Sequence, residues 1–163
     1  MHTKNCLKYF AVLFVALVWL VASSGLAADR NVAYLHQKDL GNWSYNLKGA
    51  WGKLTWSTTE GKTRFIFKGR KLRPNFSYTL VNFVDPFPGT GSICIAKSTS
   101  DGDGNLRLNG IIHGPLPRKY DQNRDTGAKI WLVNSSDIDC QNQKFLEGEP
   151  ENYLYDSRRI TIP

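Results

Sequence analysis

Two segments rich in Asp and Asn carry side chains that could bind a metal ion. Each places its oxygens at alternate positions of a turn, a spacing that lets a short loop wrap around Ca²⁺. Neither is an EF-hand, because position six is Leu106 or Thr126 rather than glycine. The same residue types also form ordinary turns, so calcium is the one cofactor predicted and turn chemistry is the alternative. The predicted ligands are Asp101, Asp103 and Asn105 in the first segment and Asp121, Asn123 and Asp125 in the second.

A second group of residues could bind an acidic or a ring-shaped ligand. The formal net charge is +7, and eight cations between Lys48 and Arg73 face one acid, Glu60. A basic face of this kind binds polyanions or serves only to keep the protein soluble. Trp43 and Trp51, with Tyr45 nearby, could stack on sugar rings. The predicted ligand-binding residues are Trp43, Trp51, Arg64, Lys68, Arg70 and Lys71.

Residue types that would support catalysis are sparse. After residue 27 the only histidines are His36 and His113, and neither an H-E-x-x-H nor a G-x-S-x-G motif occurs. We therefore expect a protein that is not an enzyme. A carboxylate pair for glycoside hydrolysis leaves no spacing signature, so this alternative stays open.

The N-terminal residues have the three parts of a signal peptide. Lys4 and Lys8 precede an apolar run over residues 10–22, and small residues follow as far as Ala27. We predict a signal peptide over residues 1–27 and a secreted or otherwise extracytoplasmic domain over residues 28–163. The alternative is an uncleaved anchor, although the run is shorter than the roughly 20 residues a spanning helix needs. Nucleic acid is not an expected partner outside the cytoplasm.

The cysteines agree with this compartment. Removal of residues 1–27 takes Cys6 away and leaves Cys94 and Cys140 as a pair. An oxidising compartment favours one disulfide between them.

The elements that would position these residues are strands. Alternation of period two is seen over residues 53–56 and 64–68, with Phe65 and Phe67 expected to point inward. The runs 77–84 and 129–133 are apolar on both faces and predict central strands. L-x-P-x-x-x-Y, ending at Tyr78, is typical of a tyrosine corner, whose hydroxyl bonds the backbone upstream. We predict an all-β fold: a single antiparallel, Greek-key-like β-sandwich of about eight strands with one disulfide.

Several segments together resemble a family of uncharacterised secreted proteins of archaea and bacteria. The matching stretches are GAWGKL (49–54), LRPNFSYTLVNFVDPFPGTG (72–91), GNLRLNG (104–110), GAKIWLVNSSDID (127–139) and PENYLY (150–155). The resemblance covers roughly residues 32–156 and implies a secreted β-sandwich. The family has no assigned activity, so the resemblance implies no chemistry.

Three functions remain open at this point. The first is a non-catalytic extracellular β-sandwich, binding or structural, that calcium could stabilise. The second is a module that binds carbohydrate or an anionic polymer, such as a polysaccharide or an acidic surface partner. The third is a subunit of a surface assembly in which residues 153–163 act as an exchanged strand. The specific ligand and the oligomeric state do not follow from the sequence.

Overall fold

The computed structural model describes residues 31–116, 127–146 and 148–160. The chain divides into two units, Met1–Asn31 and Val32–Pro163, and all described residues except Asn31 belong to the second. The predicted boundary at residue 27 therefore lies outside the described residues. In the described part of the chain, no helix is long and apolar enough to cross a bilayer.

Strands and one short helix make up the described part of the second unit. Their bounds are β1 (Val32–His36), β2 (Trp51–Thr59), β3 (Lys62–Arg70), β4 (Ser77–Phe83), β5 (Ile93–Thr99), β6 (Leu106–His113), β7 (Lys129–Asn134), β8 (Ile138–Asp139), β9 (Lys144–Phe145), the 3-10 helix η1 (Pro150–Asn152) and β10 (Leu154–Asp156). Eight strands form one antiparallel sheet in the order β5-β4-β7-β10-β1-β2-β3-β6, and β8 pairs with β9. The predicted all-β class, with about eight antiparallel strands and one disulfide, is confirmed.

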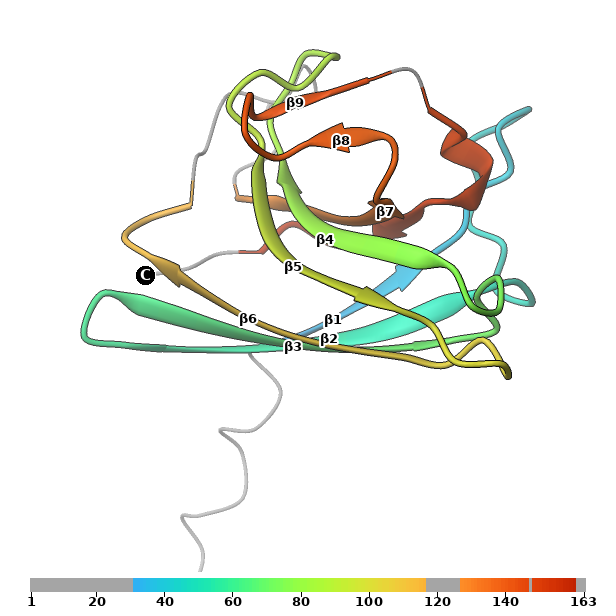
Figure 1. Ribbon diagram of the computed structural model, residues 1–163, viewed down its shortest axis with the longest axis horizontal. Helices are drawn as coiled ribbons and strands as arrows, with labels where there is room; N and C mark the ends of the chain where they lie inside the picture. Colours follow the sequence, from blue (N-terminus) through green and yellow to red (C-terminus); the bar gives the residue numbers. More distant parts are fainter. Residues whose placement is uncertain (1–30, 117–126, 147, 161–163) are drawn as a thin grey trace, which may run out of the picture. The chain divides into compact units, whose positions relative to one another are not determined.

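The eight-stranded sheet folds over so that its two halves face each other (Figure 1). One half consists of β1, β2, β3 and β6, and the other contains β5, β4 and β7. The edge strands β5 and β6 approach each other closely. The evidence is Gly110 of β6, where an added Cβ atom would collide with the backbone of Ile95 in β5. β10 returns to pair with β1, so the first and last strands of the domain lie side by side.

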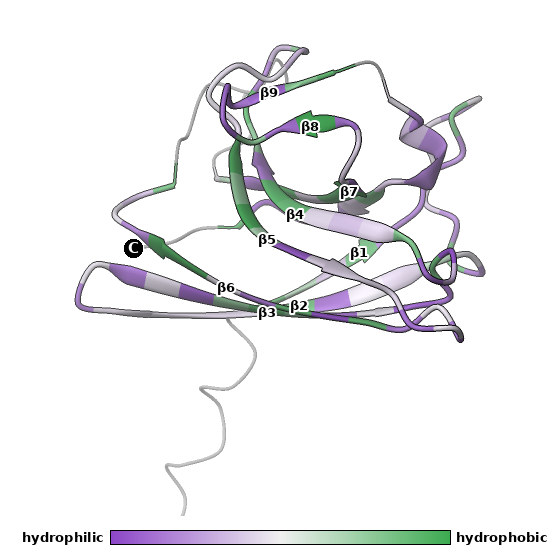
Figure 2. Ribbon diagram, in the orientation of Figure 1, coloured by the Kyte–Doolittle hydropathy of each residue, from purple (hydrophilic) through white to green (hydrophobic). Residues whose placement is uncertain are grey.

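The main core lies between the two halves and follows from alternation along the strands. Hydrophobic and hydrophilic residues share the same strands (Figure 2). In β3, Phe65 and Phe67 are fully buried, as predicted, whereas Arg64 and Lys68 are exposed. Each such buried ring stabilises the fold by roughly 1.5–3 kcal/mol relative to an exposed one.

A second core covers the outer face of β4 and β7. Both strands are buried on two faces, as their continuous apolar runs predict. In β7, Ile130 belongs to the main core, whereas Val133 belongs to the second core, which Trp131 also contacts. The β8–β9 hairpin, the chain before β10 and β10 itself complete this cluster. They contribute Ile138, Phe145, Tyr153 and Tyr155.

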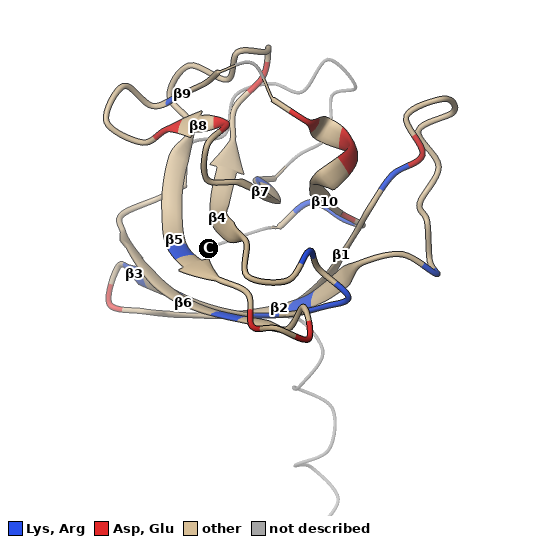
Figure 3. Ribbon diagram, turned by 45° about the vertical axis from the view of Figure 1, so that its right-hand side comes forward, with Lys and Arg blue, Asp and Glu red and all other residues tan. Residues whose placement is uncertain are grey.

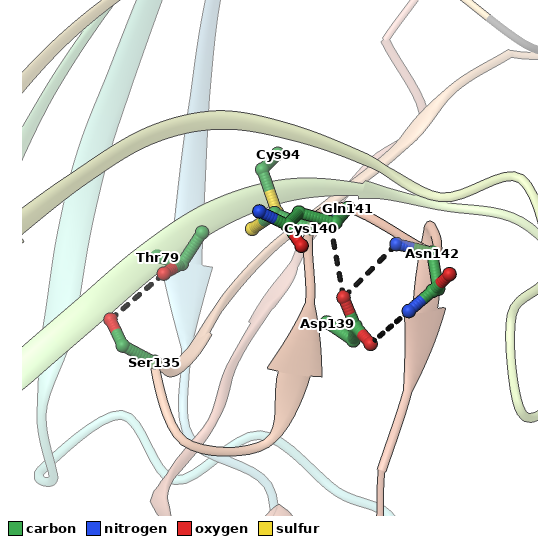
Figure 4. The surroundings of a disulfide bond; sticks show 7 residues. All are labelled: Thr79, Cys94, Ser135, Asp139, Cys140, Gln141 and Asn142. Atoms are coloured by element: carbon green, nitrogen blue, oxygen red, sulfur yellow. Dashed lines mark hydrogen bonds between the residues drawn. A yellow bond between two sulfur atoms is a disulfide. The ribbon is translucent and has the colours of Figure 1, made fainter.

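A disulfide bonds the β8–β9 hairpin, which covers the outer face of β4 and β7, to the eight-stranded sheet (Figure 4). Cys94 on β5 is bonded to Cys140, which follows β8, with 5.7 Å between the two Cα atoms. This is the predicted pair. Near the bridge, the hydroxyls of Thr79 on β4 and Ser135 share a hydrogen bond of 2.8 Å. The hairpin is therefore tied to β4 and β5 by covalent and polar contacts as well as by apolar packing.

The turn before β4 contains the predicted tyrosine corner. The hydroxyl of buried Tyr78 accepts a hydrogen bond of 3.1 Å from the backbone N–H of Arg73. Ser100 strengthens the same turn, because its hydroxyl donates to the Arg73 carbonyl at 2.6 Å and accepts from the Phe76 N–H at 3.0 Å. The crossing from β3 to β4 is thus fixed by side chains from both chain segments at one end of the β4–β5 pair.

Removing the disulfide should destabilise the domain strongly. Cys94 and Cys140 are 46 residues apart, and opening a loop of that length costs about 4 kcal/mol in the chain-entropy model. We expect the Cys94→Ala/Cys140→Ala variant to lose about this much free energy of unfolding in urea titrations. A loss below about 1 kcal/mol would mean that apolar packing alone holds the hairpin.

Replacing Tyr78 by phenylalanine should leave the Arg73 N–H without its partner. We expect Tyr78→Phe to lower the free energy of unfolding by about 1 kcal/mol, because a partly buried hydrogen bond is lost. Tyr34→Phe is the matched control, since Tyr34 is 44% exposed and its change should stay within about 0.5 kcal/mol. Equal effects of the two substitutions would contradict a structural role for the corner.

An aromatic pocket as the candidate functional site

A pocket of about 590 Å³ opens beside the second core. Aromatic rings dominate its lining, and the chain segments come from the 37–50 loop, the 83–88 turn, β7 and the region of η1 and β10. Phe83 and Trp131 stack at the base with 4.0 Å between ring centroids and 11° between ring planes. The lining residues are Trp43, Phe83, Asp85, Pro86, Phe87, Trp131, Phe145, Gly148, Pro150, Tyr153 and Tyr155.

Two of these aromatic residues are unusually exposed. Trp43 is 58% exposed and Phe87 is 65% exposed. Both belong to loops that line the pocket, one before β2 and one before β5. Large apolar side chains held in water beside an apolar pocket mark a binding surface more often than a packing role.

The loop that carries Trp43 is built from local hydrogen bonds. Asp39 caps the turn, since its carboxylate accepts from the Gly41 N–H at 2.8 Å and its carbonyl accepts from the Trp43 N–H at 2.6 Å. Trp43 itself has a φ of +59°, a left-handed conformation that costs a non-glycine residue about 1 kcal/mol or more. The fold thus maintains Trp43 in a strained and solvent-exposed position.

Lys38 lies among the rings of this loop and of β10. Its Nζ atom lies 4.9 Å from the ring centroid of Tyr45, 5.2 Å from that of Tyr155 and 5.7 Å from that of Trp43. The Trp43 ring also meets Tyr155 edge to face at 6.1 Å. The cation and the rings attract each other, and this contact connects the Trp43 loop to the wall of the pocket.

Most polar groups around the pocket already form hydrogen bonds or ion pairs within the protein. The Tyr153 hydroxyl donates to buried Asp137 at 2.8 Å, and the Tyr155 hydroxyl donates to the Pro150 carbonyl at 3.0 Å. Burial raises the pKa of both tyrosines. Asp85 in the lining forms an ion pair with Lys129. The pocket therefore offers ring surfaces and one carboxylate to a ligand.

A buried carboxylate lies behind the pocket wall. Asp156 is 3% exposed and accepts hydrogen bonds from Arg159 at 3.1 and 3.3 Å and from the Trp131 side chain. Burial raises the pKa of Asp156 to about 6, because the loss of hydration outweighs the favourable contacts with Arg159 and Trp131. Its backbone carbonyl accepts from the Tyr45 hydroxyl at 2.8 Å.

The structure separates the two tryptophans that the sequence grouped together. Trp43 lines the pocket, but Trp51 lies on β2, where its ring is 6.3 Å from that of Tyr34. Trp131 lies on a strand that the sequence predicts to be central, but its side chain is only half-buried and lines the pocket. The remaining predicted ligand-binding residues are exposed on or after β3: Arg64, Lys68, Arg70 and Lys71.

The first predicted calcium segment is a hydrogen-bonded turn. The Asp101 carboxylate accepts from the N–H of Asp103 at 3.0 Å and from the N–H of Asn105 at 2.8 Å. These bonds, led by those from Asn105, lower the pKa of Asp101. Gly104 packs against the backbone of Leu72, where a Cβ would collide. The turn therefore has a structural explanation, and calcium binding by it stays a prediction.

The second predicted calcium segment, with Asp121, Asn123 and Asp125, lies outside the described residues. Within residues 31–116, 127–146 and 148–160, no group of three or more His, Cys, Asp or Glu side chains could hold a metal ion. Comparison of the chain with protein-family models, curated proteins and solved structures gives no match. The site must therefore be interpreted from its own geometry.

The burial of Asp156 should appear in the pH dependence of stability. In the unfolded chain this carboxyl titrates near 4, so the native state binds its proton more tightly. Its contribution to stability is full below about pH 4 and is lost as the pH rises to about 6, which corresponds to about 3 kcal/mol. Asp156→Asn mimics the protonated acid, so its stability relative to the wild type should rise over this range in urea titrations.

Asp139→Asn provides the opposite control. Hydrogen bonds from Asn142 lower the pKa of the Asp139 carboxyl, so its contribution is lost as the pH falls. The stability of this variant relative to the wild type should fall as the pH rises. The same trend in both variants would contradict the assignment of the pH effect to the burial of Asp156.

Proposed function

We propose that the domain is a non-catalytic binding module that works outside the cytoplasm and holds a small ligand in the aromatic pocket. The observation that carries this proposal is the exposure of Trp43 and Phe87 beside a cavity of about 590 Å³. Pockets that bind small molecules are mostly apolar and contain a few polar groups that fix orientation. Asp85 is the polar group in the described lining that is suited to this role.

The lining favours a ligand with a flat, weakly polar ring face. Aromatic rings attract such faces by offset stacking and by edge contacts. A neutral sugar ring satisfies this description, since it presents C–H groups to the rings and hydroxyl groups to the Asp85 carboxylate. This choice agrees with the carbohydrate-binding alternative drawn from the sequence, with Trp43 retained and Trp51 assigned to a different surface.

Two features support an extracytoplasmic location. The Cys94–Cys140 disulfide is typical of oxidising compartments. The signal-peptide pattern of residues 1–27 agrees with it, as does the resemblance to a family of secreted proteins, and both stay predictions. The surface-assembly alternative has less support, because β10 pairs with β1 and β7 inside its own sheet. An exchanged strand would have to leave that position.

Trp43→Ala should weaken ligand binding without unfolding the domain. Neutral oligosaccharides titrated against intrinsic tryptophan fluorescence should give a saturable signal with the wild type. Loss of one central ring contact costs about 2 kcal/mol, so we expect about thirtyfold weaker binding. Trp51→Ala is the matched control, since it removes the same side chain from another surface, and it should leave binding unchanged.

The outcomes separate the ligand classes. Saturation by an apolar aromatic dye but by no oligosaccharide would keep the pocket as the site and reject the sugar. Equal losses in Trp43→Ala and Trp51→Ala, or no signal with any ligand, would contradict the proposed pocket function.

A further inference from the structure

The outer face of β2, β3 and β6 carries a row of cations that the strand register places side by side. Lys53 pairs with Lys68, and Lys68 pairs with Arg107. All three side chains are exposed. Neighbouring strands lie about 4.8 Å apart, so the row concentrates three positive charges within about 10 Å.

This row is unfavourable for the fold itself. Like charges directly opposite each other destabilise a strand pair. Among the described residues, none of the three cations forms a salt bridge, whereas Lys129 and Arg159 on the other half do so with Asp85 and Asp156. Folding therefore gives no reason for this repulsive arrangement, and a partner of opposite charge would explain it.

Two further cations on β3 and a hollow adjoin this row. Arg70 and Arg64 lie two and four residues from Lys68 on the same face of β3. A hollow of about 310 Å³ is lined by Lys68, Arg70 and Arg107 together with the Asp101 turn. Asn105 positions the guanidinium of Arg70, because its Oδ1 atom accepts a hydrogen bond of 2.6 Å. Arg70 is therefore an ordered cation at this end of the row, and the Asp101 carboxylate also lines the hollow.

Aromatic rings lie at the other end of the row. Tyr34 on β1 pairs with Lys53 and is 44% exposed. Its ring lies 6.3 Å from Trp51 and 6.5 Å from His36. Lys and Arg gather on β2, β3 and β6, whereas Asp and Glu occur on β8 and η1 and in the turns next to β3 and β6 (Figure 3). The basic face, defined as Tyr34, Lys53, Lys68, Arg70 and Arg107, therefore combines a line of cations with ring surface.

We propose that this basic face binds a linear acidic polysaccharide. Its anionic groups would lie along the Lys53–Lys68–Arg107 row, and one sugar ring would rest on Tyr34 and Trp51. The three cations are register partners on neighbouring strands and therefore lie in one line, which suits an extended chain of anionic groups. This surface is separate from the aromatic pocket.

The test uses two charge-matched double variants. Lys53→Gln/Lys68→Gln removes two charges from the row, and Lys97→Gln/Lys144→Gln removes two exposed charges on β5 and β9. Affinities for polygalacturonate and for heparin are measured at several NaCl concentrations. We expect the row variant to bind at least about tenfold more weakly and with a shallower salt dependence, whereas the control should change less than about twofold.

Folding and independence are checked on the same proteins. The row variant should melt at the temperature of the wild type or above it, since it removes a repulsion. Trp43→Ala should retain full polysaccharide binding, which separates this proposal from the pocket function. Equal weakening in both double variants, tighter binding of double-stranded DNA than of either polysaccharide, or no binding by the wild type would overturn the proposal.

Discussion

β4 and β7 carry apolar side chains on both faces, and the rest of the structure follows from keeping both faces away from water. One face is covered when the sheet folds over and brings β2, β3 and β6 across it. The other face needs cover that the sheet cannot supply. The chain provides it with the β8–β9 hairpin and the segment that leads into β10, and the disulfide holds that cover in place.

Because only one half of the sheet is covered on its outer face, the two halves differ chemically. The half with β4 and β7 is covered, and its aromatic pocket lies where the cover ends, beside half-buried Trp131. The half with β2 and β3 keeps one face in water and can therefore carry charge. The aromatic pocket and the row of cations therefore lie on different surfaces, because only the half with β2 and β3 has a solvated face.

The sequence predicted the fold well where the signal was local. Alternation placed Phe65 and Phe67 inward, two-sided runs identified β4 and β7 as central, and Tyr78 was recognised as a corner residue because its bond to Arg73 spans only five positions. Compartment reasoning predicted the Cys94–Cys140 bridge. The strand patterns and the tyrosine corner each lie within one short segment of the chain. The disulfide could be predicted because only one pair of cysteines remains after residue 27.

The pocket could not be predicted in the same way. Its rings come from four distant segments, and no spacing relates Trp43 to Phe87 or Trp131. Trp43 and Trp51 are close in sequence but lie on different surfaces, because the 37–50 loop reverses the chain between them. The Lys53–Lys68–Arg107 row could not be predicted from the sequence either, because it depends on the register of three strands. The Asp101 turn looked like a metal site because capping a turn and binding calcium use the same oxygens.

Lys38 occupies the position between three rings next to the pocket where a ligand cation would otherwise bind. Clusters of rings generally attract ammonium groups, and a cluster open to solvent would take one from a ligand. Here the protein's own side chain already fills that position between Tyr45, Tyr155 and Trp43. A second cation would have to expel the first and would meet its charge while doing so. If the pocket binds a ligand as proposed, a quaternary amine or another cationic ring compound would compete with Lys38 at Trp43, whereas an uncharged ligand would not.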